Sequence, residues 1–261
     1  MTPEILSPLL EIGSCSINFG GLKAVDNFNL KMFPGELVGL IGPNGAGKTT
    51  VFNLVTGVYK LTAGEIRFAG KVLNGKKPYQ ITACGIARTF QNIRLFGNLS
   101  VEDNVRIPCH RHYLTSLFGS IWKGKSYRQQ EEAQHKKVRE LLELFGLFAV
   151  AREKASSLPY GQQRKLEIAR ALATEPKLML LDEPAAGANL QESRDLMKLI
   201  RWIKEHFNLT ILLIEHDMQV VMGICERILV LDYGVTIAEG PPEKIRKDPK
   251  VIEAYLGEEA V

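Results

Sequence analysis

Long apolar runs, a leader segment and paired cysteines are all missing from this sequence. No apolar run approaches the ~18 residues that a transmembrane helix needs, and residues 1–14, MTPEILSPLLEIGS, contain no basic stretch followed by a small-residue cleavage site. We therefore expect neither a membrane-spanning helix nor a signal peptide. The four cysteines are scattered at positions 15, 84, 109 and 225, with no C-x-x-C pair. This spacing favours a reducing compartment and argues against a zinc site or a disulfide framework.

The composition is that of a globular protein with one locally basic segment. Over 261 residues, 45% are apolar and 24% are charged, which is enough for one large domain or for a core with an inserted lobe. The net charge of +4 is concentrated, because residues 106–139 hold eight lysines or arginines against two glutamates. This basic segment is interpreted either as a solvated helical face or as a docking surface for acidic protein loops, lipid head groups or nucleic acid.

The hydrophobic pattern predicts strands and helices in alternation. The first thirty residues have a β-like alternation, and LVGLIG (37–42) is a continuous apolar run of the kind found in strands buried on both faces. Similar runs recur at 177–182, 209–214 and 227–232, whereas 98–172 is more polar and helical. This order predicts an α/β fold with a parallel sheet and a helical insertion. A helix after the first buried strand is expected to carry Val51, Leu54, Val55 and Val58. A long amphipathic helix is expected at 127–146, with Leu141, Leu142, Leu144 and Phe145 near its end and Gly146 as its stop.

A phosphate-binding loop follows the first buried strand. GPNGAGKT (42–49) matches G-x-x-x-x-G-K-[ST] and lies between a predicted strand and a predicted helix, which is the context that confirms a P-loop. Its glycines let backbone N–H groups surround phosphate oxygens, Lys48 reaches the β- and γ-phosphates, and Thr49 can ligate Mg²⁺. The sequence therefore predicts a site for a nucleoside triphosphate.

Polar residues follow three further predicted strands. LMLLDE (178–183) ends in Asp182, which can hold the Mg²⁺ shell, and Glu183, which can polarise water; RTFQ offers Gln91 and LLIEHD offers His216. Each alone is more often a helix cap or a surface residue. Because ligands bind at the carboxyl ends of strands in α/β sheets, we expect Gln91, Asp182 and His216 to converge there.

These motifs, in this order and over nearly the whole chain, resemble those of the ATP-binding-cassette (ABC) ATPases. The resemblance implies a P-loop NTPase with a parallel-sheet core, an N-terminal antiparallel β subdomain and an inserted helical subdomain. It places a single domain at 8–257, with the core at 8–91 and 173–257 and the insertion at 92–172. It also implies Mg²⁺ and ATP. The residues it assigns are Phe19, Gly42, Pro43, Asn44, Gly45, Ala46, Gly47, Lys48, Thr49, Thr50 and Gln91 for ATP, with Phe19 stacking on adenine; Thr49, Gln91 and Asp182 for Mg²⁺; Glu183 and His216 for catalysis; and Tyr160, Gly161 and Gln162 for the ATP of a partner subunit.

The segment that matches the family signature departs from the usual Leu-Ser-Gly-Gly-Gln. LPYGQ (158–162) has Pro159 in place of the serine and Tyr160 in place of the first glycine. Proline is tolerated in the first turn of a helix, so the anion-binding helix N-terminus is compatible with it. Either backbone N–H groups supply the contact, which we expect, or the Tyr160 hydroxyl replaces the serine hydroxyl. Asn189 stands where many members have aspartate in the D-loop.

A finer resemblance points to one group of ABC transporters. Tyr-Gly in the signature, DEPAAG, IEHDM and the ending DPKVIEAYLGE are similar to the larger ATPase subunit of branched-chain (hydrophobic) amino-acid importers. This resemblance implies a second ATPase subunit, membrane permease subunits, an extracytoplasmic solute-binding protein as an indirect partner, and a peripheral location on the cytoplasmic face of the cell membrane. The basic segment, with Tyr113, Phe118 and Trp122, is then a candidate permease-docking surface. Alternatives are a urea-import or lipopolysaccharide-export ATPase, a soluble P-loop kinase, or a nucleic-acid-linked ABC ATPase, although no nucleic acid is expected.

Overall fold

The computed structural model describes residues 7–109 and 125–256, and the chain forms two compact units. Met1–Arg88 and Lys177–Val261 make up the first unit, and Thr89–Pro176 makes up the second. The insertion predicted at 92–172 falls inside the second unit.

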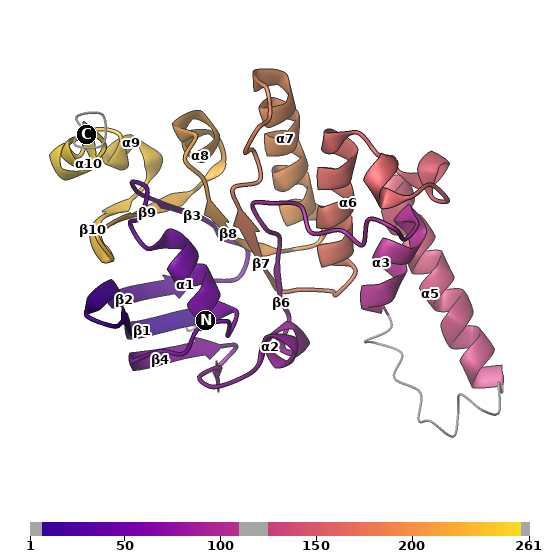
Figure 1. Ribbon diagram of the computed structural model, residues 1–261, viewed down its shortest axis with the longest axis horizontal. Coiled ribbons are helices and arrows are strands. Elements are labelled where there is room, and N and C mark those ends of the chain that lie inside the picture. Colours follow the sequence, from indigo (N-terminus) through magenta and orange to yellow (C-terminus); the bar gives the residue numbers. More distant parts are fainter. Residues whose placement is uncertain (1–6, 110–124, 257–261) are drawn as a thin grey trace, which may run out of the picture. The chain divides into compact units, whose positions relative to one another are not determined.

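A six-stranded sheet is the centre of the first unit, with the strand order β10-β9-β3-β8-β7-β6 (Figure 1). Neighbouring strands from β9 to β6 are parallel, and β10 joins the edge antiparallel to β9. Every residue of β3, β7 and β8 is buried, as the continuous apolar runs predict for strands covered on both faces. The strands are β3 Leu37–Ile41, β6 Ile86–Arg88, β7 Leu178–Asp182, β8 Thr210–Ile214, β9 Arg227–Asp232 and β10 Val235–Gly240.

A second, antiparallel sheet of the first unit has the order β2-β1-β4-β5. β1 and β2 pair from Leu10 opposite Met32 to Phe19 opposite Leu22, with bulges that shift the register. Helix α1 shares one hydrophobic core with both sheets, in which Phe52 packs with residues such as Phe28 and Leu180. The N-terminal β structure that the sequence predicts is confirmed, and it packs in the same core as the helix that follows the P-loop. The elements are β1 Leu10–Phe19, β2 Leu22–Met32, β4 Ala63–Phe68, β5 Lys71–Val72 and α1 Lys48–Val55.

Helix α1 is shorter than the sequence predicts. Val51, Leu54 and Val55 are buried in it, but Val58 lies beyond its end and is exposed. Gly57 has a φ of 71°, and a Cβ there would lie 2.5 Å from the Lys76 carbonyl oxygen. The helix ends because the chain needs this left-handed, closely packed glycine.

The other helices of the first unit flank the central sheet (Figure 1). Helix α7 buries Ile200 and Ile203. Asn189 caps this helix, because its side-chain oxygen accepts hydrogen bonds from the Gln191 and Glu192 N–H groups, both at 3.0 Å. These helices are α2 Pro78–Cys84, α7 Leu190–His206, α8 Met218–Ile224, α9 Pro242–Ile245 and α10 Pro249–Leu256.

The second unit is helical, with α3 Val101–Cys109, α5 Lys125–Leu144, α6 Tyr160–Leu172 and short 3₁₀ turns at Phe148–Val150 and Ala155–Ser157. Near the end of the predicted amphipathic helix, Leu141, Leu142 and Phe145 are buried, whereas the side chain of Leu144 is exposed. Tyr113, Phe118, Trp122 and much of the basic segment lie outside the described residues. In the described part of the chain, no helix combines the length and apolar character that crossing a membrane requires.

Candidate functional site

The P-loop is held in a shape that only glycine permits at two positions. Gly42 has a φ of 149°, and a Cβ there would lie 1.9 Å from the Leu231 carbonyl oxygen. Gly47 has a φ of 99°, and its Cβ would lie 2.6 Å from the Ala24 carbonyl oxygen. The loop therefore packs directly against β9 and β2, and its backbone curls between β3 and the first turn of α1.

Lys48 lies over the loop that it belongs to. Its side chain is almost fully buried, and its ammonium group donates hydrogen bonds to the carbonyl oxygens of Gly42 at 2.6 Å and Pro43 at 2.8 Å. Thr49 and Thr50 follow in the first turn of α1, where backbone N–H groups and the helix dipole favour an anion. The loop residues that the sequence predicts thus form one continuous bend ahead of α1, and their binding of phosphate stays a prediction.

Asp182 is the last residue of strand β7, and its carboxylate forms a buried ion pair. Its carboxylate accepts a hydrogen bond from the Arg88 guanidinium at 2.7 Å, and the two side chains are only 5% and 7% exposed. Arg88 also donates to the side chains of Asn53 at 2.7 Å and Thr56 at 3.3 Å on and after α1. The partner of Asp182 was not predicted from the sequence, because it lies on the neighbouring strand of the sheet, far away along the chain.

Glu183 and His216 come together at the carboxyl ends of adjacent strands, since Asp182 pairs with Ile214 in the β7–β8 register. The Glu183 Oε2 atom lies 3.7 Å from His216 Nδ1. Glu183 has a φ of 45°, an unusual backbone conformation for a residue other than glycine, and its N–H donates to the Ile214 carbonyl at 2.9 Å. Such strained residues cluster at functional sites. Asp217 caps α8, which leaves His216 in the turn between β8 and that helix.

A pocket of about 490 Å³ joins the P-loop to Glu183. Residues 44–50 and Glu183 of the predicted set line it, so its volume, the glycine-rich loop and the Glu183 carboxylate fit a nucleotide with a divalent cation. Phe19 does not line this pocket: its ring packs edge-on against Tyr59 at a centroid distance of 5.1 Å. The wall residues that sequence reasoning missed are Leu22, Lys23, Ala24 and Tyr233.

A buried carboxylate joins the chain segments that follow β7 and β8. Glu215 is fully buried, and it accepts hydrogen bonds from the N–H of Ala185 at 2.7 Å and of His216 at 3.2 Å. Burial raises the pKa of this carboxyl, and the hydrogen bonds lower it in part. Glu215 therefore links the chain after Glu183 to the turn that carries His216, a role that the sequence did not indicate.

The second unit contains Gln91 and the segment that resembles the signature. Helix α6 begins at Tyr160, and the Pro159 carbonyl accepts the N–H groups of Gln162 at 2.9 Å and Gln163 at 3.0 Å, so the helix N-terminus is intact with proline in front of it. The Tyr160 hydroxyl accepts a hydrogen bond from Arg164 of the same helix at 2.9 Å. Because Gln91 and β7 belong to different units, the expected convergence of Gln91 with Asp182 and His216 stays a prediction.

Comparison with known proteins agrees with this geometry. The model of the ABC transporter family matches residues 25–186, and that of the branched-chain amino acid ATP-binding cassette transporters matches residues 235–261. The chain is 48% identical over 251 residues to the high-affinity branched-chain amino acid transport ATP-binding protein LivG of Escherichia coli K12, covering 96% of this chain and 98% of the relative. Its identity to BraF of Pseudomonas aeruginosa, which has the same description, is 45% with the same coverage.

Solved structures show the same architecture. The ADP conformation of MJ1267, an ATP-binding cassette of an ABC transporter, superposes with a TM-score of 0.82 at 31% identity, covering 96% of this chain and 99% of that one. CbiO1 from Clostridium perfringens, described as part of the ABC transporter complex CbiONQ, superposes with a TM-score of 0.79 at 26% identity, covering 95% of this chain and 94% of that one.

Proposed function

The chain belongs to the ABC transporter family of ATP-binding proteins, and we propose that it is the ATP-hydrolysing subunit of an importer of branched-chain amino acids. The observation that carries this proposal is the pocket in which the P-loop faces Glu183, with His216 3.7 Å from that carboxylate. The similarity to branched-chain amino acid transport proteins over nearly the full length supports the choice of solute.

The P-loop would hold the phosphates of ATP. Lys48 donates to the loop carbonyls of Gly42 and Pro43, and turning the ammonium group toward the pocket would bring it to the β- and γ-phosphates. Thr49 and Asp182, with Gln91 from the second unit, would hold Mg²⁺. When bound, Mg²⁺ neutralises charge on the phosphates.

Glu183 would accept the proton of the attacking water. Its side chain lines the pocket beside the loop, and its backbone has a strained positive φ, which is common at functional sites. His216 is close enough to orient that carboxylate or to contact the γ-phosphate. Glu215 would keep the two chain segments in register, because it accepts hydrogen bonds from both.

The partners follow from the family and from the position of the signature. We propose that Tyr160, Gly161 and Gln162 contact ATP bound by a second ATPase subunit. The two ATPase subunits would then energise membrane permease subunits, to which a solute-binding protein delivers the amino acid. The protein would act at the cytoplasmic face of the cell membrane. The intact N-terminus of α6 behind Pro159 supports the anion-binding role.

Reconstitution tests this proposal. The chain is assembled with its second ATPase subunit and permease in vesicles, and ATP hydrolysis is measured with the binding protein loaded with leucine, with urea, or with nothing. We expect stimulation by leucine alone. Stimulation by urea, or activity that depends on lipopolysaccharide or on duplex DNA, would contradict the assignment to amino-acid import.

A further inference from the structure

The helix that begins with the signature carries a buried ion pair. Arg164 and Glu167 are three residues apart on α6, their side chains are 5% and 1% exposed, and Arg164 Nη1 lies 2.9 Å from Glu167 Oε2. A buried ion pair is a poor source of net stability, because both charges lose their hydration. Its contacts with other groups are therefore the better guide to what it does.

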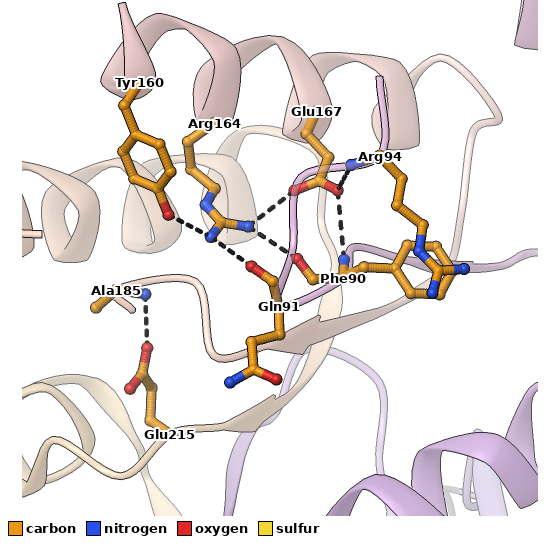
Figure 2. A network of polar contacts seen from close by, with 8 residues as sticks. All are labelled: Phe90, Gln91, Arg94, Tyr160, Arg164, Glu167, Ala185 and Glu215. Carbon is orange, nitrogen blue, oxygen red and sulfur yellow. Dashed lines mark hydrogen bonds and ion pairs between the residues drawn. The ribbon is translucent and has the colours of Figure 1, made fainter. Parts of the chain in front are cut away.

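Both members of the pair bind the backbone next to Gln91 (Figure 2). The guanidinium of Arg164 donates to the carbonyl oxygens of Phe90 at 2.9 Å and Gln91 at 3.1 Å. The carboxylate of Glu167 lies 3.4 Å from the Phe90 N–H and 3.3 Å from the Arg94 N–H, and accepts from both. One short segment, residues 90–94, is thus held by its carbonyls and by its N–H groups from a single helix.

Tyr160 completes this arrangement. Its hydroxyl accepts a hydrogen bond from Arg164 Nη2, the same nitrogen that donates to the Gln91 carbonyl. The tyrosine stands one turn before the arginine, so it fixes the far side of the guanidinium (Figure 2). A glycine at this position, as in the usual signature, would offer no such contact.

We propose that Tyr160, Arg164 and Glu167 form a clamp that fastens residues 90–94 to the signature helix, so that Gln91 and the signature move as one body. The proposal rests on the proposed function, in which Gln91 serves the chain's own nucleotide and the signature serves that of the partner subunit. The Tyr160 hydroxyl is then a positioning group that acts through Arg164, whereas the backbone at this position is the part that serves the partner's ATP. The clamp passes a shift of Gln91 directly to the signature helix.

Substitutions in the reconstituted transporter separate the clamp from simple packing. Tyr160→Phe removes only the hydroxyl, and Arg164→Lys keeps the charge but loses the planar fork that reaches both carbonyls. Tyr79→Phe and Arg139→Lys, at exposed side chains, are the matched controls. Hydrogen exchange of the Phe90 and Arg94 N–H groups reports the clamp itself, and leucine-stimulated ATP hydrolysis reports its consequence.

In Tyr160→Phe we expect faster exchange at Phe90 and Arg94, and a maximal stimulated rate lower by about tenfold, the low end for loss of one hydrogen bond to a charged group. The KM for ATP should stay unchanged, because the P-loop lies in the other unit. Arg164→Lys should lower the rate further. The double variant should be no slower than Arg164→Lys alone, because Tyr160 acts only through Arg164.

Other outcomes would overturn the clamp. Additive effects of the two substitutions, a changed KM with unchanged rate, or unchanged exchange in Tyr160→Phe would each contradict it. Faster exchange with a wild-type rate would show a contact without a role in coupling, and would also overturn the proposal. A wild-type transporter that leucine does not stimulate would instead contradict the proposed function, so the two failures are distinguishable.

Discussion

The two units each contain a buried arginine–carboxylate pair, and the pairs are used differently. In the first unit, Arg88 binds the side chain of Asp182 and two polar side chains of the α1 region. In the second unit, Arg164 binds Glu167 and two backbone carbonyls. The first pair holds a carboxylate at the place where nucleotide chemistry is expected, whereas the second holds a segment of chain.

This difference indicates that the first pair serves ATP hydrolysis and the second serves the coupling of hydrolysis to partner subunits. A carboxylate fixed by an arginine on one side keeps its position, which a metal ligand requires. A backbone segment held through carbonyls and N–H groups has a fixed path whatever its side chains are. We therefore expect damage in the first unit to abolish turnover and damage in the second unit to change how turnover depends on partners.

The largest effect is expected from Glu183→Gln in the first unit. Removing the proton acceptor should lower the rate of ATP hydrolysis by about a thousandfold, within the range for loss of a general base, while ATP still binds. Lys48→Ala should lose ATP binding instead. Equilibrium nucleotide binding and steady-state hydrolysis of the two variants distinguish these results. Unchanged hydrolysis in Glu183→Gln would remove this residue from its role.

Gly161→Asp in the second unit is the corresponding test of the signature. A Cβ at this position meets open space, so the fold should tolerate the change. The carboxylate would face the partner's γ-phosphate, and we expect hydrolysis in the assembled transporter to fall by about a hundredfold, an effect of the size seen when one transition-state contact is lost. The matched variant Gly161→Ala should retain most activity. Equal rates in the two variants would show that no anion approaches this helix.

Removing the arginine of each buried ion pair should cost similar stability but have different effects on nucleotide binding. Arg88→Met and Arg164→Met each leave a carboxylate buried without its arginine, and each should lower the free energy of unfolding by about 3 kcal/mol. Denaturant unfolding measures this, and Arg139→Met, in an exposed ion pair, is the control and should change it little. Only Arg88→Met should also weaken binding of Mg²⁺ with ATP. Equal loss of nucleotide binding in Arg164→Met would erase the distinction between the units.

The smallest effect concerns pH. Because the pKa of Glu215 is raised above its ordinary value of 4.5 in the folded protein, the folded state holds this proton more tightly than the unfolded state does. The stability from this carboxyl is complete below pH 4.5 and is lost as pH rises through the raised pKa. The melting temperature of Glu215→Gln should therefore rise relative to that of the wild type as pH increases. A difference in melting temperature that does not change with pH, as expected for the exposed control Glu140→Gln, would contradict the assignment.

Local motifs could be predicted from the sequence, and long-range partners could not. The P-loop depends on a strand, glycines and a helix that are adjacent in the chain, and the α/β fold depends on hydrophobic runs. The partners Arg88 for Asp182 and the Phe90 carbonyl for Arg164 depend on tertiary contacts between distant segments. The i,i+4 spacing of Tyr160 and Arg164 was visible in the sequence and indicates that they share a helix face, which is a signal that could have been used.

The wall of the pocket shows a further limit of sequence reasoning. Tyr233 lines the pocket beside the P-loop, whereas the stacking of Phe19, whose ring packs edge-on against Tyr59, on adenine stays a prediction. Tyr233 and Gly234 both have positive φ angles, of 43° and 79°, in the turn between β9 and β10. The Gly234 N–H donates to the Ala46 carbonyl, which brings this turn to the P-loop. Sequence spacing cannot show that a hairpin from the far end of the chain forms this wall.

The central claim is that the P-loop and the signature of one chain serve different nucleotides in a pair of subunits. The rate of ATP hydrolysis per chain, measured over a range of concentrations of the purified protein, tests it most directly. We predict that the rate per chain rises with concentration, because complete sites form only when two subunits meet, and that adding the second ATPase subunit raises it further. A rate per chain that is high and constant over the same range would show that one chain holds a complete site, and would contradict the claim.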